Sequence, residues 1–274
     1  MIQHRFALTT TSVLVALLAT VASVVPAAAQ AADQDHDAPY RTRVGLGPQI
    51  VPSFPGADTV RVQPFFDFVR ARGDEPFAFE APDESIGFAV LTLDRLSVGP
   101  VLGFEGRRRS SDVGGRLPAV GSTVEIGGFV QYQLAPAARL RTEVRQGIGG
   151  HRGLIADISA DYVARRGDAW LFSLGPRVTI TNERYERAYF GVSPSAAAAS
   201  GLRAFAAGGG IESIGATAGF VRQFTPRWGI YSYAKYERLV GDPARSPIVA
   251  RYGSKNQASA GLALTYTFGR GVGR

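Results

Sequence analysis

Beyond Tyr40 the chain alternates apolar and polar residues with a period of two, and clusters of Gly, Pro, Asp and Arg interrupt the alternation. This period is the signature of β-strands whose two faces meet different surroundings. In residues 123–134, for example, Val124, Ile126 and Val130 fall on the face opposite Gln131. The pattern predicts strands over 41–51, 60–70, 76–92, 95–107, 122–133, 138–146, 152–164, 168–181, 211–224, 227–238 and 257–268.

These segments are long for a soluble protein. Most hold about 10 to 14 residues, whereas strands of soluble sheets most often have about 5 or 6. A strand that crosses a membrane at a tilt needs about 9 to 11. Aromatic residues near the segment ends, such as Trp170, Trp228 and Tyr236, fit interfacial girdles; edge packing in a soluble β-sandwich is the alternative. The sequence therefore predicts an all-β protein, an antiparallel transmembrane β-barrel.

The connections and the strand number follow from this prediction. Short connections at 134–138, 165–168 and 225–227 alternate with long ones at 108–121, 182–210 and 241–256, and in bacterial barrels short turns face the periplasm. Eleven segments conflict with the even number that periplasmic termini require. Splitting 76–92 at Pro82-Asp83-Glu84 gives about twelve strands, and ten result if the first segment lies outside the wall.

The N-terminus has the parts of a secretory signal peptide. Arg5 precedes an apolar stretch that ends near Val25, and Ala27 and Ala29 suit a peptidase; an uncleaved membrane anchor is the alternative. We expect a signal peptide over 1–29, a mobile polar leader over 30–39, an outer-membrane barrel over 40–268 and a C-terminal tail over 269–274. This organisation places the mature chain in the outer membrane of a Gram-negative bacterium.

Composition removes several classes of chemistry. The 274 residues include no Cys, which excludes disulfides, thiolate metal sites and cysteine nucleophiles. The only long apolar run is N-terminal, which excludes a bundle of membrane helices. The formal net charge is +7, but the basic residues alternate with lipid-type positions, and we expect no nucleic-acid binding. No grouped metal ligands or phosphate loop occur, and we expect no cofactor.

The charged face of two neighbouring segments is the main candidate site. Strand spacing points six side chains toward the lumen: Arg139, Arg141, Glu143 and Arg145 from one segment, Asp157 and Asp161 from the next. Cross-strand ion pairs are expected between them. Two interpretations remain open: a salt-bridged plug in a narrow barrel, or a cationic pore that favours small anionic solutes.

Two loop features have a functional and a structural interpretation. His151 is the sole His that could serve a mechanism, but Asp157 and Asp161 lie progressively deeper along one strand and cannot both reach it. We therefore interpret His151 as a turn residue and expect no enzyme. The run Arg107-Arg108-Arg109 either binds lipopolysaccharide phosphates or forms a solvated loop.

The last predicted strand ends in Tyr266-Thr267-Phe268. Tyr266 and Phe268 resemble the signal by which outer-membrane barrels are recognised by the barrel-assembly machinery, although six residues follow Phe268 here. An ordinary amphipathic strand with an interfacial aromatic residue would look the same.

Several motifs in this order resemble the MipA/OmpV outer-membrane proteins, the MltA-interacting protein family. They lie at 53–58, 60–64, 96–100, 149–154, 156–157, 160–162, 189–194, 198–202, 239–242 and 246–249, and their loop residues include Pro55, Gly56, Asp58, Gly150, His151, Tyr189, Phe190, Gly191, Ser246 and Pro247. The resemblance implies an outer-membrane barrel and no catalytic residues.

The resemblance also implies a function. The best-known member of the family is a scaffold that links a lytic transglycosylase to a bifunctional penicillin-binding protein during peptidoglycan growth. Other members are regulated outer-membrane proteins, adhesins or routes of antibiotic entry. We expect the scaffold role, with outer-membrane lipid and lipopolysaccharide as further partners. The alternative is a narrow, Arg-lined channel for small anionic solutes.

Overall fold

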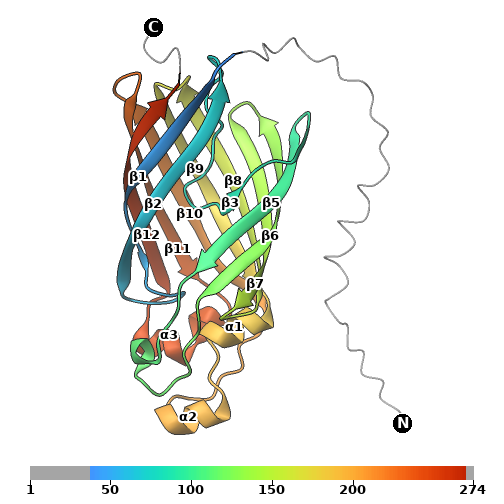
Figure 1. Ribbon diagram of the computed structural model, residues 1–274. Coiled ribbons are helices and arrows are strands. Elements are labelled where there is room, and N and C mark those ends of the chain that lie inside the picture. Colours follow the sequence, from blue (N-terminus) through green and yellow to red (C-terminus); the bar gives the residue numbers. More distant parts are fainter. Residues whose placement is uncertain (1–37, 270–274) are drawn as a thin grey trace, which may run out of the picture. The chain divides into compact units, whose positions relative to one another are not determined.

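The computed structural model describes residues 38–269, which form one antiparallel sheet with short helices in its long loops (Figure 1). The long strands are β1 (Tyr40–Pro52), β2 (Val60–Arg72), β5 (Leu96–Glu105), β6 (Thr123–Ala135), β7 (Ala138–Gly149), β8 (Leu154–Arg166), β9 (Trp170–Thr181), β10 (Gly210–Gln223), β11 (Trp228–Leu239) and β12 (Asn256–Phe268). Two short strands are β3 (Ile86–Gly87) and β4 (Leu91–Leu93). The helices are α1 (Glu183–Tyr189), α2 (Pro194–Ser200) and α3 (Pro247–Tyr252), with 3-10 turns η1 (Ser110–Val113) and η2 (Pro243–Arg245).

The sheet curls so that the first and last strands of the chain lie side by side. β1 pairs with β12 from Thr42↔Phe268 to Ile50↔Ala260, and the remaining strands follow in chain order from β12 back to β5. The twelve strands confirm the predicted all-β antiparallel barrel. At its free ends the sheet stops at β2 and at β5 with β3 and β4, and no pairing joins these ends within residues 38–269. We call this unpaired line between β2 and β5 the seam.

The wall has an apolar outer face and a polar inner face. On β6, Val124, Ile126 and Val130 are exposed, whereas Thr123 and Glu125 are buried inside. The same inversion recurs around the sheet, so the large apolar side chains point outward and many charged ones point inward. This arrangement suits a wall that is surrounded by lipid.

The two ends of the barrel differ. At one end, the turn end, β6–β7, β8–β9 and β10–β11 are joined by short turns, beside the start of β1 and the end of β12. At the opposite loop end the long connections fold over the opening, and the three α-helices gather there (Figure 1). We call residues 53–59, 106–122, 150–153, 182–209 and 240–255 the cap.

The cap has apolar cores of its own. One core includes Tyr185, Tyr189, Phe190 and Val249, and another includes Phe54, Val113 and Ile248. Phe205 packs against both clusters. Because each core draws residues from several loops, the loops form one packed layer over the loop end.

The prediction of wall strands over 76–92 is wrong for its first half. Residues 73–85, which we call the lumen segment, leave β2 at the turn end and run inside the barrel before β3 begins (Figure 1). Its alternating residues resemble a strand, but Phe77 and Ala81 are buried against the inner wall. Phe79 packs on an inner core of Phe65, Leu171, Val221, Tyr231, Tyr233 and Ala263. Only residues 86–87 and 91–93 remain strands, so the sheet has ten long strands and two short ones.

The predicted signal peptide, nearly all of the leader and residues 270–274 of the tail lie outside the described residues. Among residues 38–269, no helix combines the length and the apolar character needed to cross a membrane.

Candidate functional site

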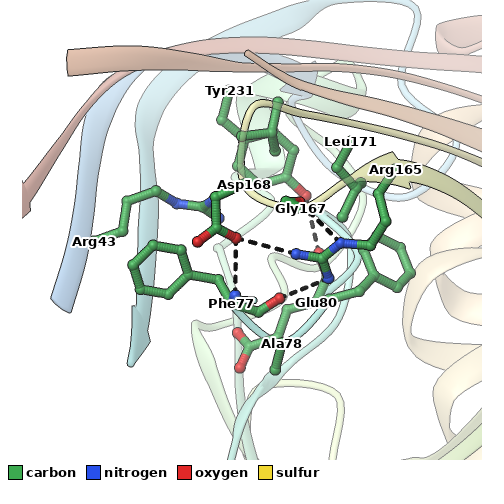
Figure 2. A pocket seen from close by; sticks show the side chains of 11 residues that line it. Arg43, Phe77, Ala78, Glu80, Arg165, Gly167, Asp168, Leu171 and Tyr231 are labelled. Carbon is green, nitrogen blue, oxygen red and sulfur yellow. Dashed lines mark hydrogen bonds and ion pairs between the residues drawn. The ribbon is translucent and has the colours of Figure 1, made fainter. Parts of the chain in front are cut away.

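The lumen segment is fastened at the turn end by a group of charged side chains (Figure 2). Arg41 donates to the carbonyl oxygens of Gly73 and Glu75 and pairs with Asp168 at 2.9 Å. Asp168 Oδ1 accepts from the Phe77 amide at 3.0 Å, and Arg165 Nη1 donates to the Phe77 carbonyl at 2.8 Å. The hollow lined by Phe77, Arg165, Asp168 and their neighbours has a volume of only about 10 Å³, which leaves room for no more than one water molecule.

Deeper in the barrel, two carboxylates of the lumen segment are held by cations from three strands. Arg177 on β9 pairs with Asp83 at 2.9 Å, and Lys235 on β11 lies 3.4 Å from it. The Thr217 hydroxyl donates to Asp83 at 2.7 Å. Glu84 accepts from Arg139 on β7. The segment is therefore tied to most of the inner wall and fills the half of the lumen near the turn end.

The six charged residues predicted to face the lumen do lie together on the inner wall. Arg139 pairs with Asp161 at 3.1 Å and Arg141 with Glu143 at 2.7 Å. Arg145 contacts Asp157 at 2.7 Å and Glu143 at 2.8 Å. Every Arg of this set is thus neutralised by at least one carboxylate.

Sequence reasoning missed several members of this network. Glu125 pairs with Arg145 at 2.8 Å, and Arg177 joins Asp161 at 2.8 Å. Strand spacing places both side chains inside, and their charge could have marked them. Asp83 and Glu84 were hidden because their segment was assigned to the wall.

A larger cavity of about 900 Å³ lies between the lumen segment and the cap. Eight carboxylates line it but only four cationic side chains. The acidic residues are Asp83, Glu84, Glu105, Glu125, Glu143, Asp157, Glu212 and Glu237, and the basic ones are Arg61, Arg145, Arg177 and Lys235. Its charge is opposite to that of the predicted cationic pore.

His151 is buried beneath the cap, 2% exposed. Its Nδ1 accepts from the Gly153 amide at 2.9 Å, so Nε2 carries the proton and donates to Glu125 at 3.0 Å. Its ring packs edge-on against Tyr185, with centroids 4.9 Å apart. The contacts describe a histidine that ties the β7–β8 loop to β6.

Most of the loop residues that carry the family resemblance converge in the cap. Gly56 has φ +87°, and a Cβ there would lie 3.0 Å from Val249 and 3.1 Å from Phe190. The Ser246 hydroxyl donates to the Phe190 carbonyl at 2.7 Å and caps α3 through the Ile248 amide. Gly150, Tyr189, Gly191 and Pro247 also lie in the cap, while Pro55 is half-buried and Asp58 is exposed.

The run Arg107-Arg108-Arg109 divides into two environments. Arg107 and Arg109 are exposed, but Arg108 is buried and donates to the carbonyls of Tyr189 at 2.6 Å and Pro118 at 3.0 Å. Burial lowers the pKa of Arg108 to about 10. The guanidinium stays charged at neutral pH, but it cannot reach an external phosphate.

Two further cap residues, Glu186 and Tyr189, have raised pKa values. Burial raises the pKa of Glu186 to about 7, although the Thr181 hydroxyl donates to its Oε1 at 2.6 Å. Burial also raises the pKa of Tyr189 well above its ordinary value. No group of His, Asp and Glu that could hold a metal ion occurs among residues 38–269.

The aromatic residues at the end of β12 lie on its outer face at the turn end. Tyr266 packs edge-on against Trp228 and against Phe268, each with centroids 4.7 Å apart. The cluster has the position of an interfacial girdle.

Taken together, the apolar outer face, the lumen segment that fills the turn-end half of the lumen and the folded cap define an outer-membrane β-barrel with an obstructed interior. A sequence profile described as "MltA-interacting protein MipA" matches residues 44–268. The chain belongs to the MipA family.

Other comparisons concern curated proteins and solved structures. No curated protein matches the chain. Similar solved structures include the N-terminal β-barrel domain of Pseudomonas aeruginosa OprF, with 14% identity and TM-score 0.28 over 62% of this chain and 96% of that one. An outer membrane channel from Pseudomonas putida F1 has 13% identity and TM-score 0.35 over 90% and 100%. The Pseudomonas putida toluene transporter TodX has 11% identity and TM-score 0.32 over 84% and 90%.

Proposed function

We propose that this chain is a non-enzymatic scaffold in the outer membrane of a Gram-negative bacterium. It binds a lytic transglycosylase and a penicillin-binding protein that builds peptidoglycan. The observation that supports this role is the lumen segment packed across the turn-end half of the barrel, because a barrel that is plugged at one end contributes its surface rather than a continuous pore. The description of the family, which names an interaction with MltA, supports the first partner.

The anion channel receives less support from the geometry. The arginines that motivated it are paired with carboxylates, and the lumen segment fills the half of the barrel near the turn end. A planar bilayer that contains the protein is expected to show no conductance above background. Stable anion-selective conductance would favour the anion channel over the scaffold.

The turn end is the surface proposed to meet the enzymes, because short turns face the periplasm in bacterial barrels. Arg166 and Arg222 are exposed there, and both pair in register with Trp170. A basic rim with a neighbouring aromatic residue suits a docking contact, since Arg and Trp dominate the energetics of interfaces.

The test is a pull-down from detergent extracts with the tagged full chain. We expect a lytic transglycosylase and a penicillin-binding protein to be enriched, and Arg166→Glu with Arg222→Glu to reduce both. The matched control reverses two exposed cap arginines, Arg184→Glu with Arg203→Glu, and should leave capture unchanged. Absence of both enzymes from the wild-type eluate would reject the scaffold.

Two further partners are proposed from surface features. Exposed cations around the loop end outnumber exposed acids; they are Arg107, Arg109, Arg116, Arg152, Arg184, Arg187, Arg203, Arg238, Arg245, Arg251 and Lys255. Arginine binds phosphate in a bidentate manner, so this surface suits lipopolysaccharide. Binding to lipopolysaccharide vesicles should weaken with salt and after dephosphorylation of the lipid. Tyr266 and Phe268 are proposed contacts for the barrel-assembly machinery, and Phe268→Ala should slow insertion into membranes.

A further inference from the structure

The 900 Å³ cavity is lined by side chains from both faces of the wall. Phe66, Leu102 and Phe104 point outward and are 69%, 48% and 71% exposed. Lys235 and Glu237, which line the same cavity, point inward.

Val124 and Ile158, which point outward from strands paired on both sides, line the cavity as well. Phe66, Leu102 and Phe104 differ from them because they lie on β2 and β5, which do not pair with each other. The cavity therefore meets the lipid-facing side of the wall where these two strands are unpaired.

The opening coincides with the seam. β2 pairs along its whole length with β1 and with no second strand in the described part of the chain. Beyond Leu102, the edge of β5 that faces the seam is also unpaired, since β3 reaches only Val101 and Leu102. Pro64 on β2 lines the cavity and lacks an amide hydrogen, which reduces the number of unpaired donors on this edge. Near the loop end the ion pair of Arg61 with Glu105, at 3.6 Å, crosses the seam.

The other two routes to the cavity are obstructed. The packed cores of the cap cover the loop end. The lumen segment and the inner core around Tyr231 fill the turn end. The seam is thus the approach that neither the cap nor the lumen segment covers in the described residues, and it leads from an apolar surface to a charged interior.

The acidic interior of the cavity favours a positively charged ligand. The carboxylate of Glu212 is available to pair with such a ligand. At Glu212 the pairing of β10 with β9 shifts between Ile211 and Ser213, a bulge that turns both Glu212 and Ser213 inward. Bulges commonly re-aim side chains in this way. The Tyr185 hydroxyl donates to Glu212 at 3.5 Å, and no cationic side chain in residues 38–269 pairs with this carboxylate.

We propose that the cavity binds an amphipathic organic cation, a protonated amine with an alkyl tail, which enters from the membrane through the seam and pairs with Glu212. The volume lies within the range of small-molecule sites, about 300 to 1,000 Å³. The apolar mouth receives the tail and the acidic interior receives the amine. The site is independent of the scaffold role, which concerns the turn end.

The test uses the full barrel in lipid nanodiscs with photoreactive dodecylamine and, as a matched probe, photoreactive dodecyl sulfate. Both probes enter the bilayer, so only the head group differs. We expect the amine, and not the sulfate, to label peptides of β2, β5 and residues 210–217. Excess unlabelled dodecylamine should compete, and dodecanol should not.

Two variants locate the site. Glu212→Gln should lower amine labelling about tenfold, the factor that corresponds to about 1.4 kcal/mol, whereas Glu183→Gln on the cap surface should leave it unchanged. Because the chain has no Cys, Val62→Cys with Phe104→Cys can be bridged across the seam by a bis-maleimide. Bridging should abolish labelling of residues 210–217, and reaction with a mono-maleimide should not.

The outcomes separate the parts of the proposal. Equal labelling by amine and sulfate, or undiminished labelling of Glu212→Gln, overturns the cationic site. Undiminished labelling of the bridged protein overturns entry through the seam. If excess unlabelled dodecylamine does not reduce labelling of the wild type by the photoreactive amine, specific binding is overturned altogether.

Discussion

At the scale of single residues, the cap depends on polar groups that are buried with few partners. His151 and Glu186 are examples: each is nearly inaccessible, and each has a defined hydrogen bond to a neighbouring element. A buried polar group that loses its partner costs about 1 to 3 kcal/mol. Single substitutions at these positions should therefore report on the cohesion of the cap.

Replacement of His151 by Ala should destabilise the cap. The change leaves the Gly153 amide and the Glu125 carboxylate without their partner and opens a void beside Tyr185, at a cost of about 2 to 4 kcal/mol. Hydrogen exchange of the amides in residues 147–153 should accelerate. Arg152→Ala, next to it but exposed, is the control; equal acceleration in both variants would contradict the role given to His151.

The pH dependence of the cap should reveal Glu186. Because burial raises its pKa from 4.5 to about 7, the folded cap retains a proton that the unfolded chain releases. The contribution of Glu186 to the free energy of unfolding is fully present below about pH 4.5 and is lost as the pH rises through 7. Urea unfolding in lipid vesicles should show a fall in stability between pH 5 and 8 that Glu186→Gln removes. A fall of the same size in that variant would exclude Glu186 as the cause.

At the scale of elements, the β1–β2 loop must pass close to α3. Gly56 combines a positive φ with a tight approach to Val249, whereas Gly115 has a similar φ of +76° and nothing within 4 Å. Gly115→Ala should thus cost only the backbone strain, about 1 kcal/mol. Gly56→Ala adds a clash and should cost about 2 to 4 kcal/mol. Equal midpoints of urea unfolding for the two variants would contradict the tight approach.

The lumen segment is the other element to consider, and Asp83 provides its contacts with Arg177 and Lys235. Asp83→Asn leaves Arg177 and Lys235 without this carboxylate, and breaking a buried ion pair costs about 3 kcal/mol. Hydrogen exchange in residues 77–85 should accelerate roughly a hundredfold. Asp74→Asn, exposed in the same segment, should have no effect. Unchanged exchange in Asp83→Asn would show that the segment is held mainly from the turn end.

These two elements also mark what the sequence can predict. The wall strands follow from alternation, because lipid and lumen impose opposite chemistry on their faces. Residues 77–81 alternate in the same way, yet their apolar side chains pack against the inner wall of the barrel. The pattern cannot distinguish this apolar surface from lipid. Likewise, Glu125 meets His151 only because the β6–β7 register brings Thr123 opposite Gly149. Register comes from the assembled sheet, so this contact was not predictable.

At the scale of the whole molecule, charge is arranged in three layers. Basic side chains dominate the loop end, carboxylates dominate the cavity, and exposed arginines such as Arg166 and Arg222 recur at the turn end. The net +7 of the chain thus conceals an acidic interior between two basic rims. Each rim can meet an anionic partner, while the interior offers the opposite charge.

The lumen segment has a consequence for the order of assembly. It follows β2 in the chain, but its partners Arg139, Arg177 and Lys235 belong to strands that come much later in the sequence. Contacts between residues so distant in sequence form slowly, because the intervening chain must first be ordered. The sheet must therefore curl before the partners of the lumen segment on β7, β9 and β11 come within reach of it. In a pulse-labelling experiment, amides 77–85 should become protected after those of β8 and β9; earlier protection would contradict this order. A segment from the first third of the chain is then the last to fold into place, and the folding barrel passes through an intermediate with an empty lumen.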